Sequence, residues 1–143
     1  MPKRGVDLLK GILNAPSIQE QFHGALKEHS GTFVASVIDL YNSDNSLQQC
    51  EPRQVVMEAL KAAVLKLPLN KGLGFAYLVP FKNKKGGFTP SFQIGYKGYI
   101  QLAMRTGQYR VLNADKAYEG EMHNVNKLTG EISFEGARKS DKI

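Results

Sequence analysis

The chain has 143 residues, enough for one domain with a substantial core, and its Lys and Arg residues give it a formal net charge of +6. No long apolar run is present, so the sequence predicts no membrane-spanning helix, and charged residues interrupt the segment after Met1, which predicts no secretory signal. The single cysteine, Cys50, cannot form an internal disulfide, which favours a reducing, cytoplasmic location.

The first 67 residues are predicted to form helices. Residues 17–20 have the spacing of a capping box, and apolar residues follow them at helical intervals. A second apolar stripe at 33–41 ends at the turn-forming segment 42–45. Pro52 suits the first turn of a third helix that continues to about Leu67. Because that helix is apolar on almost every side, we expect it to be the buried one.

From residue 68 onward, proline and glycine break the helical pattern and strands are expected. Segments 75–81 and 88–94 are predicted strands, joined by a hairpin loop at 83–87. Pro80 and Pro90 cannot donate a backbone hydrogen bond, which places parts of both strands at edges or bulges.

The remaining sequence predicts a short helix at 96–106, stopped by Gly107, and an extended segment at 109–118. A second hairpin is expected from 122–125 and 132–135. The fold class is therefore α+β, with N-terminal helices followed by ββαβ and a β-hairpin. We divide it into a helical part, 1–67, and a basic core, 68–143, within one continuous domain. The tail after the last strand leaves an open edge, which predicts a chain truncated inside its fold.

Positive charge is concentrated in the stretch between Lys66 and Lys116. It contains nine Lys or Arg residues and a single acid, whereas acids outnumber cations in the rest of the chain. The same stretch holds eight of the thirteen aromatic residues. Clustered cations neutralise phosphates and planar rings stack on unpaired bases, which predicts a nucleic-acid interface. The alternative is a solvated basic face over an aromatic core.

Motifs for catalysis are mostly missing from the sequence. The glycines at 72–74 precede a strand rather than follow one, and 84–87 lacks the spacing of a phosphate-binding loop, so no nucleotide cofactor is expected. The three histidines are scattered, which argues against a zinc site. A divalent-metal site remains an alternative to a solvated acidic edge at four carboxylates, Asp115, Glu119, Glu121 and Glu131.

The predicted helix at 96–106 has a polar stripe formed by Lys97, Gln101 and Arg105. The alternative is an ordinary amphipathic surface helix, but the nearby hairpin loop adds further unbalanced charge. We assign the phenylalanines of this region, Phe75, Phe81, Phe88 and Phe92, mainly to packing. The better candidates for base contacts are the tyrosines Tyr96, Tyr99 and Tyr109.

Two runs carry a resemblance to a known family. The first is LNKGLGFAYLVPF at 69–81, and the second is FQIGYKGYIQLAMRTGQY at 92–109. Both resemble the RecT family of phage and prophage recombinases, and the similarity extends upstream through 40–44 and 50–52 and downstream from Val111 to Glu121. It covers nearly the whole chain, although family members continue well beyond this length.

The resemblance implies a single-strand annealing protein rather than an enzyme. Such proteins coat single-stranded DNA, pair it with a complementary strand without ATP through an annealed duplex intermediate, and form homo-oligomeric rings or helical filaments. They act beside a 5′-to-3′ exonuclease in bacterial cells. The implied fold is the one shared with lambda Red beta, in which a β-hairpin and short sheet pack on helices and DNA lies in a basic groove.

The sequence therefore predicts binding and annealing of single-stranded DNA, with no cofactor, no metal and no membrane partner. The predicted phosphate contacts are Lys71, Lys82, Lys84, Lys85, Lys97, Arg105, Arg110 and Lys116, with sugar or phosphate hydrogen bonds from Gln93 and Gln101 and stacking by Tyr96, Tyr99 and Tyr109. Two alternatives stay open: a generic RNA- or single-stranded-DNA-binding module, and a metal-dependent nuclease.

Overall fold

A computed structural model describes residues 5–110, 112, 115–122, 124–134 and 136–143. Contacts divide the chain into two compact units, Met1–Val111 and Leu112–Ile143, and each is described by itself. The division predicted between residues 67 and 68 lies inside the first unit. Among the described residues, no helix has both the length and the apolar character needed to cross a membrane.

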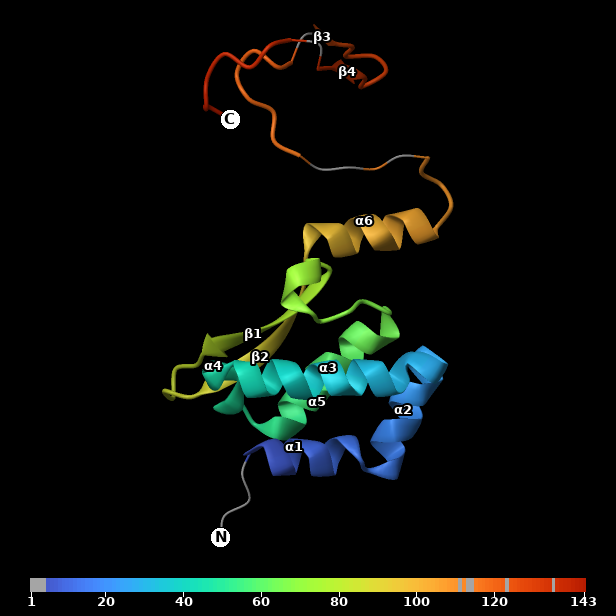
Figure 1. Ribbon diagram of the computed structural model, residues 1–143, viewed down its shortest axis with the longest axis vertical. Coiled ribbons are helices and arrows are strands. Elements are labelled where there is room, and N and C mark those ends of the chain that lie inside the picture. Colours follow the sequence, from blue (N-terminus) through green and yellow to red (C-terminus); the bar gives the residue numbers. More distant parts are fainter. Residues whose placement is uncertain (1–4, 111, 113–114, 123, 135) are drawn as a thin grey trace. The chain divides into compact units, whose positions relative to one another are not determined.

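The first unit is mainly helical and contains one hairpin, whereas the second contains two very short strands, so the α+β class is confirmed (Figure 1). The elements of the first unit are α1 (Gly5–Leu13), α2 (Pro16–Leu26), η1 (Lys27–His29), α3 (Ser30–Ser43), α4 (Asn45–Gln48), α5 (Pro52–Val64), η2 (Lys71–Leu73), β1 (Ala76–Lys82), β2 (Phe88–Ile94) and α6 (Tyr96–Arg105). Those of the second unit are β3 (Asn124–Val125) and β4 (Ile132–Ser133).

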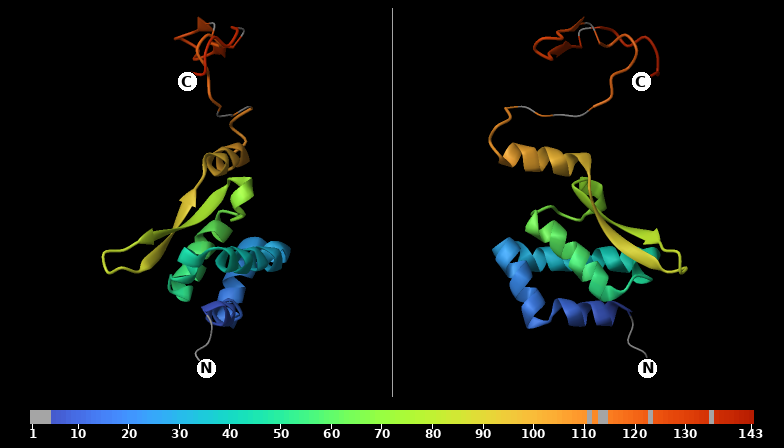
Figure 2. Two further views of the ribbon diagram at one scale, coloured as in Figure 1. Left: turned by 60° about the vertical axis from the view of Figure 1, so that its left-hand side comes forward. Right: turned by 180° about the vertical axis from the view of Figure 1, so that it is seen from behind.

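Helix α5 is the centre of the first unit, as its apolar character predicted. It contacts α1 and α2 as well as both strands of the hairpin (Figure 2). Its buried residues are Val55, Val56, Ala59, Ala62 and Ala63, and the small alanines allow neighbouring backbones to approach closely. Met57 and Val64 remain exposed, so one side of the helix faces solvent.

The N-termini of α2 and α4 differ from the prediction, whereas that of α5 agrees with it. The capping box at 17–20 is wrong, because Pro16 takes the first turn of α2 and Ala15 supplies no side-chain cap. Pro52 begins α5 as expected. Asp44 caps α4, where its Oδ1 accepts hydrogen bonds from the N–H groups of Ser46 and Leu47 at 2.9 and 3.1 Å. The expected turn at 42–45 is thus reduced to this one residue.

The antiparallel hairpin of β1 and β2 forms as predicted, with Ala76 opposite Ile94 at one end and Lys82 opposite Phe88 at the other. The two prolines, Pro80 and Pro90, face each other, and a two-stranded ladder gives both an edge position. Residues 83–87 form the expected loop, in which the Asn83 side chain accepts hydrogen bonds from the N–H groups of Lys85 and Gly87 at 3.0 Å each.

Helix α6 is joined to the open end of the hairpin by a contact between backbones. The Gly95 N–H donates to the Phe75 carbonyl at 2.9 Å. A Cβ placed on Gly98 would lie 2.1 Å from that same carbonyl oxygen, and one on Gly95 would lie 2.4 Å from the oxygen of Gly74. Gly74 itself has a φ of +71°, which favours glycine. The glycines of the two sequence runs therefore meet in space.

The second unit contains the predicted second hairpin, with Asn124 opposite Ser133 and Val125 opposite Ile132. The tail after this hairpin returns to residue 119. The Lys139 N–H donates to the Glu119 carbonyl at 2.7 Å, and the Glu119 N–H donates to the Lys142 carbonyl at 2.9 Å. The described part of the predicted extended segment 109–118 contains no assigned strand. Five positions of the predicted extended and hairpin segments, 111, 113, 114, 123 and 135, lie outside the described residues.

Replacing Gly98 by alanine should destabilise the protein by roughly 1–3 kcal/mol, because the new methyl group overlaps the Phe75 carbonyl. Gly24→Ala is the matched control, since Gly24 is also helical but has no atom within 4 Å of the added Cβ. That change should stabilise by about 0.5–1 kcal/mol. Urea denaturation followed by circular dichroism measures both, and equal effects of the two changes would contradict the close docking of α6.

Candidate nucleic-acid interface

Three predicted phosphate contacts lie together at the closed end of the hairpin. Lys82 ends β1, and Lys84 and Lys85 lie in the loop, with all three exposed. Within the described residues, no ion pair involves them. The hydrogen bonds of Asn83 hold the loop, so these cations sit on an ordered element and are available to an anionic partner.

The predicted stacking residues are exposed on and after α6. Tyr96 and Tyr99 are 58% and 61% exposed, and Tyr109, which follows the helix, is 50% exposed. Lys97 and Gln101 are exposed on the same helix. The aliphatic chain of Lys97 passes over Gly74, where an added Cβ would lie 3.4 Å from its Cδ. Helix α6 and the segment after it therefore carry rings and a cation that the core does not use.

Three of the four phenylalanines assigned to packing lie where the sequence predicts, and one does not. Phe75, Phe88 and Phe92 are partly buried and pack against the core, as expected. Phe81 is 53% exposed, so its assignment to packing is wrong. It is the penultimate residue of β1, and strand alternation places it on the face opposite to the buried Ala76 and Leu78. Phe81 therefore adds an exposed ring next to Lys82.

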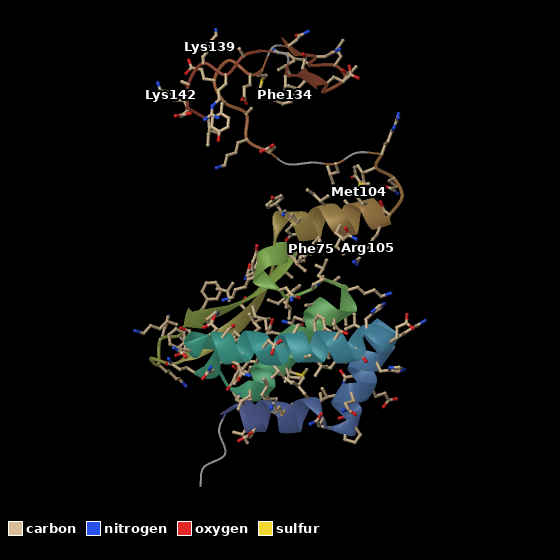
Figure 3. All side chains as sticks on the ribbon, in the orientation of Figure 1. Phe75, Met104, Arg105, Phe134, Lys139 and Lys142 are labelled. Atoms are coloured by element: carbon tan, nitrogen blue, oxygen red, sulfur yellow. The ribbon has the colours of Figure 1, made fainter. Side chains whose placement is uncertain are left out.

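Arg105 points to the helical body rather than away from it (Figure 3). Its two terminal nitrogens donate hydrogen bonds to the carbonyl oxygens of Leu65 and Lys66 at 2.6 and 2.9 Å. These carbonyls follow the last turn of α5, where unpaired acceptors and the negative end of the helix dipole favour a cation. Arg105 therefore holds α6 against the end of α5, whether or not it also contacts phosphate.

Two other predicted contacts have protein partners. The Lys71 Nζ lies 3.4 Å from Oδ2 of Asp44, in an ion pair that joins η2 to the cap of α4. The amide of Gln93 donates to the Ser91 hydroxyl at 2.9 Å. Both Lys71 and Gln93 remain exposed, so replacing this contact by one to a ligand costs little free energy.

The predicted residues form two clusters rather than one adjacent patch. The loop lysines lie at one end of the ladder and α6 begins at the other, as the views of Figures 1 and 2 agree. Strands of seven residues place about 20 Å between these ends, at ~3.3 Å per residue. Arg110 follows α6 in the first unit, whereas Lys116 belongs to the second unit. The hairpin is thus the element that connects the two clusters.

A polar contact that the sequence did not reveal holds the edge of β2 against α5. The Phe92 N–H donates to Oε2 of Glu58 on α5 at 3.0 Å, and Oε1 of the same carboxylate pairs with Lys61 at 2.8 Å. A single acid on a mostly apolar helix is the only sequence signal for such a contact. It satisfies a strand N–H that the ladder leaves unpaired and aligns the hairpin on α5.

The four carboxylates considered for a metal site take part in separate local hydrogen bonds. Glu119 accepts from the Ser140 hydroxyl at 2.6 Å, and Glu121 accepts from the Tyr118 N–H at 2.9 Å. Asp115 and Glu131 also have partners within two residues. Among the described residues, no group of three or more His, Cys, Asp or Glu is placed to hold a metal ion.

Two groups in the helical core, Cys50 and Tyr41, have raised pKa values. Burial raises the pKa of Cys50, and the nearby Asp44 carboxylate raises it further. Burial also raises the pKa of Tyr41, whose hydroxyl donates to the Gln48 carbonyl at 3.4 Å. Cys50 is therefore a protonated, buried residue of the core, as its position in a helical region predicted.

Comparisons with known proteins agree with the sequence runs that meet at α6. Residues 31–143 match the RecT family. The chain is 43% identical over 136 residues to the uncharacterized protein YqaK of Bacillus subtilis strain 168, covering 94% of this chain and 46% of that protein. It is 32% identical over 115 residues to protein RecT of Escherichia coli strain K12, covering 77% of this chain and 43% of that protein. The chain thus spans less than half the length of these curated relatives.

Arg105→Ala should lower the free energy of unfolding by about 1–2 kcal/mol, because two carbonyls at the end of α5 lose a charged donor. Lys97→Ala should change it by less than about 0.5 kcal/mol, since Lys97 is exposed on the same helix and donates no hydrogen bond to the described residues. Denaturant titrations compare the two variants. Equal stability of both would show that the contact with α5 contributes nothing.

Proposed function

The chain belongs to the RecT family, and from this premise we propose that it binds single-stranded DNA and anneals complementary strands in homologous recombination. The observation that carries the proposal is the placement of exposed lysines and tyrosines on the hairpin and α6, outside the helical core. Lysines at both ends of the hairpin favour a strand lying along it. No covalent step is part of this proposal.

Annealing requires a protein that holds the backbone of a strand and leaves its bases able to pair. Lys82, Lys84, Lys85 and Lys97 are point charges suited to phosphates, which position a strand without selecting its sequence. The tyrosines of α6 offer flat faces on which a base of any type stacks. Such contacts keep base edges accessible to a second strand, and the DNA's own hydrogen bonds then supply the specificity.

Pairing of this kind releases its own free energy and needs no ATP, which suits a sequence without a nucleotide-binding loop. Each subunit offers few phosphate contacts, so we propose that many subunits act together on one strand as a ring or filament. The intact protein then works in the bacterial cytoplasm with a 5′-to-3′ exonuclease that exposes the strand.

The direct test is a gel shift in EDTA without ATP, in which a second oligonucleotide is added to a complex of the protein with the first. We expect a complementary second strand to be retained far more strongly than a non-complementary one. Equal retention, or a requirement for ATP, would reject annealing. Preferential binding of folded RNA in competition would favour the RNA-binding alternative, and magnesium-dependent loss of the oligonucleotide would favour a nuclease.

Binding of single-stranded DNA should weaken steeply with salt. If four to six phosphates are neutralised per subunit, the slope of log K against log salt should be about −3 to −4, at ~0.7 per contact. The change Lys82→Ala/Lys84→Ala/Lys85→Ala should make this slope less steep by about 2. Lys10→Ala on α1 is the control and should leave it unchanged. Fluorescence anisotropy measures the slope, and a value near zero would mean that the charge serves only solubility.

A further inference from the structure

A groove of about 550 Å³ lies between two segments that are distant in the sequence. One side consists of the end of α2, η1 and the first turns of α3, and the other is the segment 66–73 that leads from α5 to the hairpin. Its apolar lining is formed by Leu26, Phe33, Leu67, Pro68 and Leu73. Leu73 is 45% exposed, so part of this lining is open to solvent.

Two lysines with unusual backbones flank this groove. Lys27 and Lys66 have φ values of +52° and +53°, and they are the only non-glycine residues with positive φ in the described part of the chain. Both line the groove and both are exposed. A left-handed backbone is unfavourable for a residue with a side chain, and such strain is often retained where function requires it.

Lys66 occupies a position where helices usually have glycine. The Lys66 N–H donates to the Ala63 carbonyl at 2.9 Å, and the Leu67 N–H donates to the Ala62 carbonyl at 3.0 Å. This pair of bonds ends α5 in the Schellman pattern, whose left-handed residue is most often glycine. The fold alone would thus favour glycine over lysine at this position.

Lys27 is the C-cap of α2, one position earlier relative to its helix than Lys66 is to α5. Its N–H donates to the His23 carbonyl, and its ψ of −121° places it outside the usual left-handed helical region. A side chain is therefore at least as costly here as at Lys66. Two helices that contribute to one groove both end in a lysine where glycine would be easier.

The charge around the groove favours an anion. Within the described residues, neither Lys27 nor Lys66 forms an ion pair. The groove has one acidic lining residue, Glu28, whose carboxylate lies 3.8 Å from the imidazole of His29. A positive excess at the rim and an apolar lining match a nucleotide, which has a charged phosphate and a flat base.

The groove also lies next to residues that contact α6. Arg105 of α6 donates to the Lys66 carbonyl, so the end of the helix adjoins this rim. On the other side, Leu73 lines the groove, and its neighbour Gly74 lies under the chain of Lys97. Lys97 and the groove therefore belong to neighbouring parts of the first unit.

We propose that this groove is a nucleotide subsite for single-stranded DNA, in which Lys27 and Lys66 contact the backbone and a base enters the apolar lining. The inference rests on the proposed function and adds a second contact region to it, on the helical part of the chain. It explains why both positions have a strained lysine in place of glycine.

The test replaces each lysine by the residue that its backbone prefers. Lys27→Gly and Lys66→Gly should leave the melting temperature unchanged or raise it by about 2–4 °C, because the strain is relieved. The double variant should bind a labelled dT oligonucleotide more weakly, with a salt slope less steep by about 1.4, or ~0.7 per lost contact. Lys66→Arg keeps the charge and should retain binding, and Lys10→Ala is the control for general loss of charge.

Photocrosslinking locates the bound base. An oligonucleotide containing 5-iododeoxyuridine should crosslink to peptides from residues 26–36 or 66–73 of the wild-type chain, and less to those of the double variant. Full binding by a stabilised double variant, or crosslinks confined to other segments, would overturn the subsite and leave the proposed function standing. No binding of single-stranded DNA by the wild-type chain would overturn both.

Discussion

The contact between Gly98 of α6 and the carbonyl of Phe75 sets the position of the hairpin relative to the helix that follows it. Any side chain at Gly98 would overlap that oxygen, and one at Gly95 would overlap the oxygen of Gly74. Gly98 is therefore buried against the hairpin, whereas Tyr96 and Tyr99 of the same helix stay exposed. One helix thus docks against the hairpin and also presents aromatic rings to solvent.

Polar contacts then join this region to the helical body. Arg105 binds the end of α5, and Glu58 of the same helix binds the edge of β2. Because both contacts involve α5, the helix that forms the core also aligns the hairpin and α6. The lysines of the loop and Lys97 take no part in this framework and are available for phosphates. The division between residues that hold the fold and residues that we propose to bind DNA therefore depends on their contacts and does not follow charge alone.

Much of this could be predicted from the sequence, because local chemistry determines it. The alternation of apolar and polar residues and the flanking turn residues predicted the observed bounds of β2. Gly107 predicted the end of α6 to within one residue. The rest depends on contacts between distant segments. Arg105 and Lys97 lie on the same helical stripe in the sequence. Arg105 differs from Lys97 in the structure because the end of α5 lies next to it and accepts its hydrogen bonds. The groove has walls from residues 25–36 and 66–73, and no local pattern signals the positive φ of the two lysines that flank it.

The most direct measurement of the central claim is a lysine footprint with and without a single-stranded oligonucleotide. Acetylation followed by mass spectrometry reports the reactivity of each exposed lysine. The account predicts strong protection of Lys82, Lys84, Lys85 and Lys97 by DNA, with little change at Lys10 of α1 and Lys61 of α5. Protection spread evenly over all exposed lysines, or concentrated on Lys10 and Lys61, would contradict the claim that the hairpin and α6 form the DNA-binding face.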